Sequence, residues 1–368
     1  MTYRIGLIVG MEDDFPAAFI EKVNQHPEFH AELVKLGGVP ERLDRFYDVI
    51  VDRLSHEVPY YRFFLKAAKL AGTYVINDPL WWAADDKFFG FSLASKLGVA
   101  VPRTLLLPQQ DYIAAIDKKK SLRNLIFPLD WEAIADYIKF PAILKPADGG
   151  GWKNVTKVDD MRQLLTAYNE SGQLAMTLQE FIDFDEYVRC LCIGREMVLP
   201  IKYDPKHRQY VKKGKFLPDA LERRIVEDAY AINEALGYDM NSVEFAVRDG
   251  VPYAIDFTNP APDMYRWSLG DPYWELCVDE MVRFAMKAAR EREARTAPST
   301  ERPGAAHAYL WTHAQRGLVG QGYRMIGGDE PGRRATTVEG LCTRVSSRSA
   351  SRRSTRSSTP RRASCART

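Results

Sequence analysis

The stretch FPAILKPADGGGWKNV, residues 140–155, ends an apolar run in Lys145 and then places three consecutive glycines at 149–151. An ammonium group at a strand end can neutralise phosphate charge. Glycines have no Cβ, so their backbone N–H groups can approach a ligand closely. Neither GxxxxGK[ST] nor GxGxxG is present around this lysine, which excludes a Walker loop and a dinucleotide fingerprint. The stretch therefore predicts a strand and loop that hold polyphosphate in another way.

Other charged residues stand at fixed places around this stretch. Lys87 begins a predicted helix behind two acidic residues, and Glu180 lies in the apolar strand LQEFI, suited to gripping a purine. Glu244 and Asp256 lie on two alternating runs that flank an Asp-Gly turn at 249–250, which predicts a hairpin with the two carboxylates close across it. Facing carboxylates need a cation between them, and hard oxygen ligands of this kind suit Mg²⁺ bridging nucleotide phosphates.

The first part of the chain alternates short apolar strands with amphipathic helices. We expect strands at 3–9, 47–55 and 73–78, and helices at 15–24 and 59–72. Strands alternating with helices indicate a parallel, doubly wound α/β unit.

The following segments predict an α+β arrangement. A helix capped by Asp85 or Asp86 ends at Gly98, and residues 109–139 are expected to be polar and helical. We expect strands at 101–108, 175–182 and 187–204, helices at 158–171, 218–236 and 272–293, and the hairpin within 240–263.

The order of the motifs DK (86–87), ILKPADGGG (143–151), QEFI (179–182), VEF (243–245) and IDFTNP (255–260) resembles the ATP-grasp superfamily. Within it, the chain is similar to the carboxylate–amine ligases related to glutathione synthetase and the ribosomal-protein S6 glutamate ligase. The resemblance covers about residues 3–290. It implies an N-terminal pre-ATP-grasp domain (1–82) and an ATP-grasp domain (83–290). The latter would have a small glycine-loop lobe (about 121–184) and a metal-binding lobe (about 185–290).

The resemblance also implies roles for individual residues. Phosphate contacts are implied for Lys87 and Lys145, a closing loop for Gly149, Gly150 and Gly151, and adenine or ribose contacts for Glu180, Phe181, Ile182 and Glu186. Lys202 is a further cofactor-binding candidate, and Lys145 and Arg189 are the catalytic candidates. Glu244 and Asp256 match the metal carboxylates. The family reads E-x-N at the second of these positions, whereas this chain reads Asp256-Phe257-Thr258-Asn259, so either Thr258 or Asn259 is the third ligand.

The implied function is an ATP- and Mg²⁺-dependent ligase, with Mn²⁺ as an alternative metal. It would join a small-molecule or peptide carboxylate to an amine through an acylphosphate. Two alternatives stay open: a catalytically weak ATP-binding protein of the same fold, and an RNA-associated protein that uses an arginine-rich tail.

Composition separates the last part of the chain from the rest. Residues 291–368 contain fifteen arginines, no lysine and six acidic residues, and become almost entirely Ser, Arg, Thr and Ala from 343 onward. Such a low-complexity segment predicts disorder, and a shifted reading frame is an alternative explanation of it. Because no apolar run approaches a membrane span, we expect a cytoplasmic protein without membrane contact. Nucleic acid is expected at most on the tail, and a homo-oligomer is an open alternative.

Overall fold

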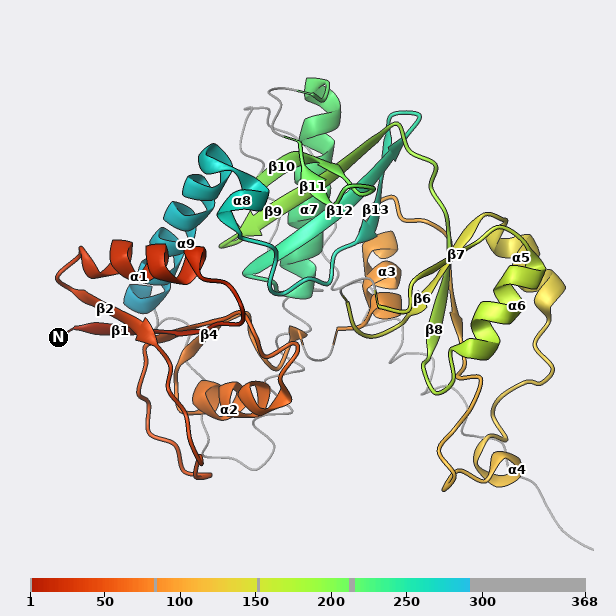
Figure 1. The fold of residues 1–368 in the computed structure, drawn as a ribbon, viewed down its shortest axis with the longest axis horizontal. Helices are drawn as coiled ribbons and strands as arrows, with labels where there is room; N and C mark the ends of the chain where they lie inside the picture. The colour runs from red at the N-terminus through yellow and green to blue at the C-terminus, as the bar shows by residue number, and fades with distance from the viewer. Residues whose placement is uncertain (1, 83–84, 151–152, 212–215, 292–368) are drawn as a thin grey trace, which may run out of the picture. The chain divides into compact units, whose positions relative to one another are not determined.

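The N-terminal part of the chain forms a four-stranded parallel sheet in the order β2-β1-β3-β4 (Figure 1). Its strands are β1 (Tyr3–Ile8), β2 (Phe29–Leu33), β3 (Val49–Asp52) and β4 (Tyr74–Ile76), and its helices are α1 (Asp14–Asn24) and α2 (Pro59–Leu70). This structure is a computed structural model that describes residues 2–82, 85–150, 153–211 and 216–291, all within one compact unit.

Alternate side chains of β1 pack into two different hydrophobic cores, one on each face of this sheet. Ile5 and Leu7 face the core that contains Phe15 and Phe19 of α1, while Ile8 faces the core around α2. Successive strand residues point to opposite faces, so a helix is needed on each side. The doubly wound arrangement expected from the sequence is confirmed, although the sequence analysis missed β2.

The stretch around Lys145 belongs to a second, four-stranded antiparallel sheet in the order β5-β8-β6-β7. Its strands are β5 (Thr104–Leu107), β6 (Ala142–Pro146), β7 (Thr156–Val158) and β8 (Met176–Glu180). The nearby helices are α3 (Lys87–Lys96), α4 (Lys118–Ser121), α5 (Trp131–Ile138) and α6 (Met161–Glu170). β5 belongs to this sheet through its pairing with β8, although it precedes residue 121, near which the small lobe is expected to begin.

The third sheet is five-stranded and antiparallel, in the order β11-β10-β9-β12-β13. It contains β9 (Glu186–Ile193), β10 (Met197–Asp204), β11 (Gln209–Tyr210), β12 (Met240–Arg248) and β13 (Val251–Asp256). The single strand expected at 187–204 is wrong, because Gly194 and Arg195 take positive φ values of 68° and 55° and turn the chain into a hairpin. The second hairpin is confirmed, with Asp249 and Gly250 at φ 53° and 73° between its strands.

Three more helices complete the described chain: α7 (Asp219–Leu236), α8 (Arg266–Leu269) and α9 (Asp271–Glu291). Helix α7 packs on the third sheet, and it ends at Gly237 in the left-handed conformation (φ 72°). Helix α9 shares a core with α1 and β1, so the end of the described chain covers the N-terminal sheet (Figure 1).

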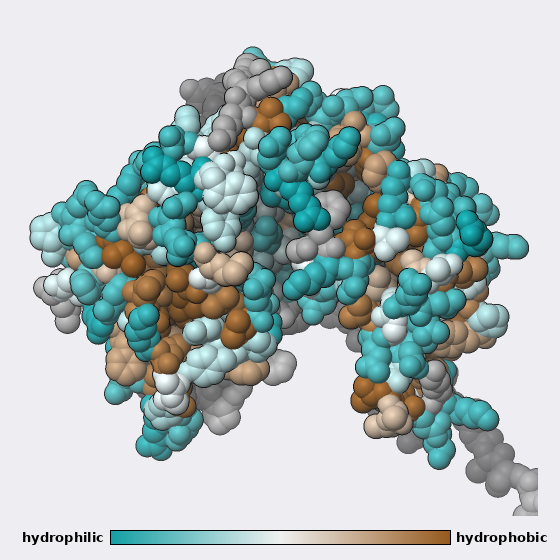
Figure 2. Space-filling model, viewed as in Figure 1, coloured by the Kyte–Doolittle hydropathy of each residue, from teal (hydrophilic) through white to brown (hydrophobic). Residues whose placement is uncertain are grey.

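The surface of the protein bears on two expectations, a homo-oligomer and a protein without membrane contact. On the viewed face hydrophobic residues gather over the N-terminal sheet, at left in Figure 2, but no second chain is present and a homo-oligomer stays a prediction. Across the described ranges, no helix combines the length and the apolar character that a bilayer crossing needs. Of the tail expected to be disordered (291–368), Glu291 ends α9, and residues 292–368 lie outside the described residues, as does Gly151.

Candidate active site

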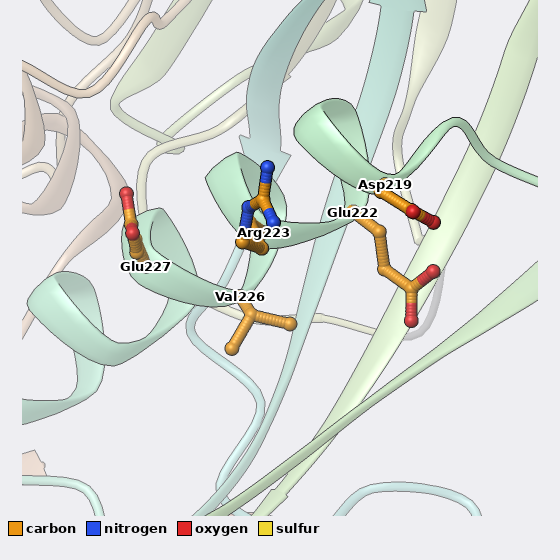
Figure 3. Close-up of a pocket in the computed structure, with 5 residues that line it drawn as sticks. All are labelled: Asp219, Glu222, Arg223, Val226 and Glu227. Atoms are coloured by element: carbon orange, nitrogen blue, oxygen red, sulfur yellow. The ribbon is translucent and has the colours of Figure 1, made fainter. Parts of the chain in front are cut away.

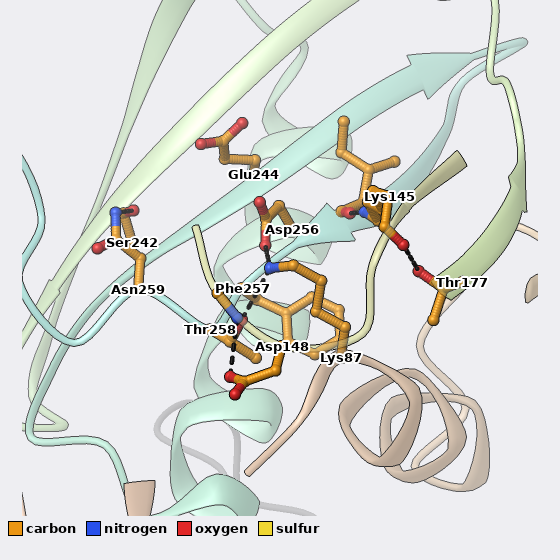
Figure 4. A network of polar contacts seen from close by, with 12 residues as sticks. Lys87, Lys145, Asp148, Thr177, Ser242, Glu244, Asp256, Phe257, Thr258 and Asn259 are labelled. Carbon is orange, nitrogen blue, oxygen red and sulfur yellow. Dashed lines mark hydrogen bonds and ion pairs between the residues drawn. The ribbon is translucent and has the colours of Figure 1, made fainter. Parts of the chain in front are cut away.

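Lys87 is the first residue of α3 and points across to the third sheet (Figure 4). The Asp86 carboxylate caps the helix by accepting from the Phe89 backbone N–H at 2.8 Å. This fixes the helix start, from which the Lys87 Nζ lies 3.3 Å from both Asp256 Oδ1 and Thr258 Oγ1. The backbone N–H of Lys87 donates to Ala147 O, so α3 is tied to the loop after β6.

Lys145, on β6, reaches the end of β13, where Asp256 is the last residue. Its ammonium donates to Gln179 Oε1 at 3.0 Å and to the carbonyl of Ile255 at 3.1 Å, beside Asp256. Only 7% of Lys145 is exposed. Burial, together with the like charge of Lys87, lowers the pKa of Lys145 to about 8, although the Asp256 carboxylate acts in the opposite direction. The two candidate phosphate lysines therefore converge on one site.

The two candidate metal carboxylates are neighbours across the β12–β13 ladder, as the hairpin predicts. Glu244 pairs with Asp256 in register, next to a bulge between Glu244 and Phe245. The Asp256 side chain is 44% exposed and that of Glu244 only 11%. Burial acts to raise the pKa of Asp256, but Lys87 and Lys145 outweigh it and hold the pKa below its ordinary value.

Glu244 is already bonded on both carboxylate oxygens. Arg189 Nη2 donates to Oε1 at 2.5 Å from the adjacent strand β9, and the hydroxyl of Tyr187 donates to Oε2. The Arg189 guanidinium carbon also lies 3.9 Å from the ring centroid of Tyr203. Burial acts to lower the pKa of Arg189, but Glu244 outweighs it and raises the pKa. The structure thus brings the catalytic candidate Arg189 and the metal candidate Glu244 together as an ion pair.

Thr258 and Asn259 face different neighbours. The Thr258 hydroxyl lies with Lys87 and Asp256, whereas the Asn259 amide donates to Ser242 Oγ at 2.9 Å (Figure 4).

The candidates for the adenine contacts, Glu180, Phe181 and Ile182, lie at the end of β8 and directly after it. Glu180 accepts from Arg103 Nε at 3.0 Å and pairs with Arg248 at 3.4 Å. Burial acts to raise the pKa of Glu180, but Arg103 outweighs it and lowers the pKa. Phe181 lies under the ammonium of Lys157, 4.3 Å from its ring centroid, and Ile182 is buried.

The remaining candidates divide between a separate ion pair and the glycine loop. Glu186 and Lys202 pair with each other, Nζ to Oε2, at 2.5 Å. Gly149 has a φ of +95°, which favours glycine, and a Cβ on Gly150 would meet no atom within 4 Å. The loop therefore has both the backbone freedom and the open space that a close ligand contact requires.

Sequence reasoning missed several polar residues around the two lysines. Gln179 binds Lys145, and Asn241 contacts the backbone on both sides of Thr258. Burial raises the pKa of Asp85 to about 7, although the hydroxyl of Tyr238 donates to it at 3.0 Å. The motif DDK placed Asp85 next to Lys87, but only tertiary packing shows that Asp86 caps the helix while Asp85 turns inward.

The carboxylate, hydroxyl and ammonium groups of this site are of the kinds that bind a Mg²⁺ nucleotide. Mg²⁺ in proteins commonly takes one or two carboxylates and completes its shell with phosphate oxygens and water. Asp256, Glu244 and the Thr258 hydroxyl offer hard oxygens of this type next to two ammonium groups. Among the described residues no three His, Cys, Asp or Glu side chains converge as a metal cluster.

A surface pocket on one face of α7 is separate from these residues and is lined by Asp219, Glu222, Arg223, Val226 and Glu227 (Figure 3).

Solved structures share this architecture. A RimK-domain ATP-grasp protein from Sphaerobacter thermophilus superimposes with a TM-score of 0.56 at 18% identity, covering 77% of this chain and 99% of that one. The chain has the ATP-grasp fold. A D-alanine–D-alanine ligase from Bacillus anthracis complexed with ATP gives a TM-score of 0.56 at 15% identity, over 80% of this chain and 99% of that one. The macrocyclase MdnC from Microcystis aeruginosa, bound with a precursor peptide, gives 0.53 at 11% identity, over 78% of this ATP-grasp chain and 100% of that one.

Sequence comparison gives a shorter match. D-alanine–D-alanine ligases from Ralstonia nicotianae and Ralstonia pickettii are 28% and 26% identical over 161 residues, which is 38% of this chain. The match spans about half, 48%, of each relative's length. No protein-family model matches the chain.

Proposed function

We propose that this ATP-grasp protein is an ATP-dependent ligase that joins a carboxylate to an amine. The sequence relatives it matches are named D-alanine–D-alanine ligases, and the structure of one such ligase contains ATP. The observation that carries the proposal is the convergence of Lys87, Lys145 and Asp256 on one strand end, beside the glycine loop. Paired ammonium groups suit the binding and reaction of a polyphosphate, because phosphoryl transfer is catalysed mainly by positioning and by neutralisation of the phosphoryl charge.

The proposed reaction has two steps. An oxygen of the substrate carboxylate attacks the γ-phosphorus of ATP, the bond to the bridging oxygen breaks, and ADP leaves. The amine nitrogen of the second substrate then attacks the acyl carbon of the acylphosphate. The C–O bond to phosphate breaks, inorganic phosphate leaves with the bonding electrons, and the nitrogen loses a proton to give the amide.

The chain's own residues supply the charge for these steps. Lys87 and Lys145 neutralise phosphoryl oxygens, and the loop at Gly149 and Gly150 covers the acylphosphate so that water does not hydrolyse it. Asp256, Glu244 and a third oxygen from Thr258 or Asn259 would hold Mg²⁺, with Mn²⁺ as a substitute, and the ion would supply further charge neutralisation. Arg189 acts on the reaction through Glu244, to which it is bonded.

The adenine side is proposed at the end of β8. Glu180 is the last residue of β8 and Phe181 and Ile182 follow it, and the backbone of Ile182 would meet the base. Glu186, paired with Lys202, is proposed to face the ribose.

One observation favours a catalytically weak ATP-binding protein as the second candidate. Both oxygens of Glu244 are bonded to Arg189 and Tyr187, so a metal would have to compete with a cation already in place. Small-molecule or peptide substrates, a cytoplasmic location and the absence of nucleic-acid partners other than at the tail are predictions, and RNA binding by the tail concerns residues outside the described part.

Phosphate release with Mg·ATP across paired carboxylates and amines tests the proposal. Turnover should require both substrates, and Lys145→Met should abolish it, whereas the exposed Lys139→Met should retain wild-type rates. With an ¹⁸O-labelled carboxylate, one label should appear in the released phosphate, because that oxygen stays with the phosphorus when the amide forms. ATP binding without turnover would favour the second candidate, and no nucleotide binding would refute both.

A further inference from the structure

The turn that follows β13 is held by buried polar side chains from three parts of the chain. Asn77, 1% exposed, donates to the carbonyls of Met240 and Pro260 at 2.8 and 3.0 Å. Arg53, 4% exposed, donates to the carbonyl of Pro262 at 2.6 Å. Since a buried carbonyl without a partner costs free energy, these bonds fix the path of the turn.

Asn241 fixes one residue of this turn in particular. Its amide nitrogen donates to the carbonyl of Phe257 at 2.8 Å, and its amide oxygen accepts from the backbone N–H of Asn259 at 3.0 Å. One fully buried side chain therefore bonds the backbone immediately before and immediately after Thr258. The same amide nitrogen donates to Asn233 Oδ1 on α7 at 2.9 Å, so Asn241 itself is held from behind.

With its flanking peptide groups held in this way, Thr258 faces α3. A Cβ on Gly90 would lie 3.7 Å from the Thr258 methyl group, and the Thr258 hydroxyl lies 3.3 Å from Lys87 Nζ. Asn259 faces away, with its amide on Ser242 (Figure 4).

We infer that Asn241 is a positioning residue that selects the Thr258 hydroxyl, and not the Asn259 amide, as the third oxygen beside Glu244 and Asp256. The inference rests on the proposed function, because a third oxygen matters only if a metal nucleotide occupies the site. Asn259 then belongs to the frame of the turn together with Ser242. This chain would hold its cation with a hydroxyl, which reaches less far than an amide.

The test measures Mn²⁺ affinity in the presence of saturating ADP, from the electron paramagnetic resonance signal of free Mn²⁺, together with the thermal midpoint of each variant. Thr258→Val removes the hydroxyl at equal size, and Asn241→Asp removes the two donated bonds. Each should weaken Mn²⁺ binding about tenfold, as loss of a supporting contact around a metal commonly does. The double variant should bind as weakly as Asn241→Asp alone, because both changes act through one oxygen.

Asn24 is a matched control for Asn241. Its amide also bonds both backbone groups of one residue, Ala31, at 3.1 and 2.7 Å, but in the N-terminal sheet. Asn24→Asp should lower the thermal midpoint and leave Mn²⁺ affinity unchanged. Thr166→Val, on the exposed face of α6, should change neither quantity.

The outcomes separate the inference from the function it rests on. Losses that add in the double variant would overturn the positioning role of Asn241. Asn259→Ala abolishing Mn²⁺ binding while Thr258→Val retains it would overturn the choice of oxygen. Wild-type protein that binds no ADP at all would instead overturn the proposed function, and the inference with it.

Discussion

Raising the pH should weaken nucleotide binding because Lys145 loses its proton within the accessible range. Burial lowers the pKa of Lys145 from 10.5 to about 8, so the folded free protein carries this charge below pH 8 and loses it above. A bound polyphosphate favours the ammonium form and raises its pKa, so affinity falls as pH rises from about 8.

The size of the effect follows from the fraction of Lys145 that is protonated. Between pH 7.5 and 9.5 this fraction falls about 25-fold for a pKa near 8, which corresponds to a loss of about 2 kcal/mol in binding free energy. Full restoration of the ordinary pKa by the nucleotide would extend the loss to about 3 kcal/mol by pH 10.5. The nucleotide's own phosphates are ionised throughout this range and add no slope.

Isothermal titration of ADP at constant ionic strength measures this directly. Lys145→Arg keeps its charge over the whole range and should show no decline, and Lys145→Met should bind weakly at every pH. A wild-type affinity that changes less than threefold between pH 7.5 and 9.5, or a parallel decline in Lys145→Arg, would refute the assignment of the slope to Lys145.

Two further predictions concern stability. Arg189→Met should lower the free energy of unfolding by about 3 kcal/mol because it leaves Glu244 buried without its cation, and adding Glu244→Gln should recover part of this loss in chemical denaturation; equal stability of the single and double variants would argue against a net contribution from the pair. Gly237→Ala should destabilise by more than 2 kcal/mol, since its Cβ would lie 2.3 Å from the Trp81 ring at a φ of +72°. Gly250→Ala, with a similar φ of +73° but open space around it, should cost only about 1 kcal/mol, and equal melting temperatures for the two variants would contradict the steric account.

Much of the fold could be predicted because the turn and cap residues in the sequence match the turns and helix ends of the structure. The Asp-Gly pair at 249–250 predicts a turn with positive φ values, and the helix before Gly237 ends where a left-handed cap is needed. The convergence of Lys87, Lys145 and Asp256 followed from motif order and is seen in the structure.

Other features depend on contacts that no local pattern contains. The strands at Phe29–Leu33 and Thr156–Val158 are short, and partners elsewhere in their sheets define them. Glu180 meets Arg103, 77 positions earlier in the chain, so its two arginine partners could not be foreseen from QEFI. The break at Gly194 did have a local signal, since it is the one glycine within the run 187–204 that was taken as a single strand.

The position of helix α9 has a consequence for how the protein is made. Its Cys277 and Met281 lie in one core with Phe19 of α1, and Lys22 bonds Glu275 and Asp279. A nascent chain that has emerged only as far as the glycine loop therefore lacks the α9 side chains that complete the core around α1. Vectorial synthesis leaves this core incomplete until α9 leaves the ribosome, which makes the interval before α9 emerges the time of greatest need for a chaperone.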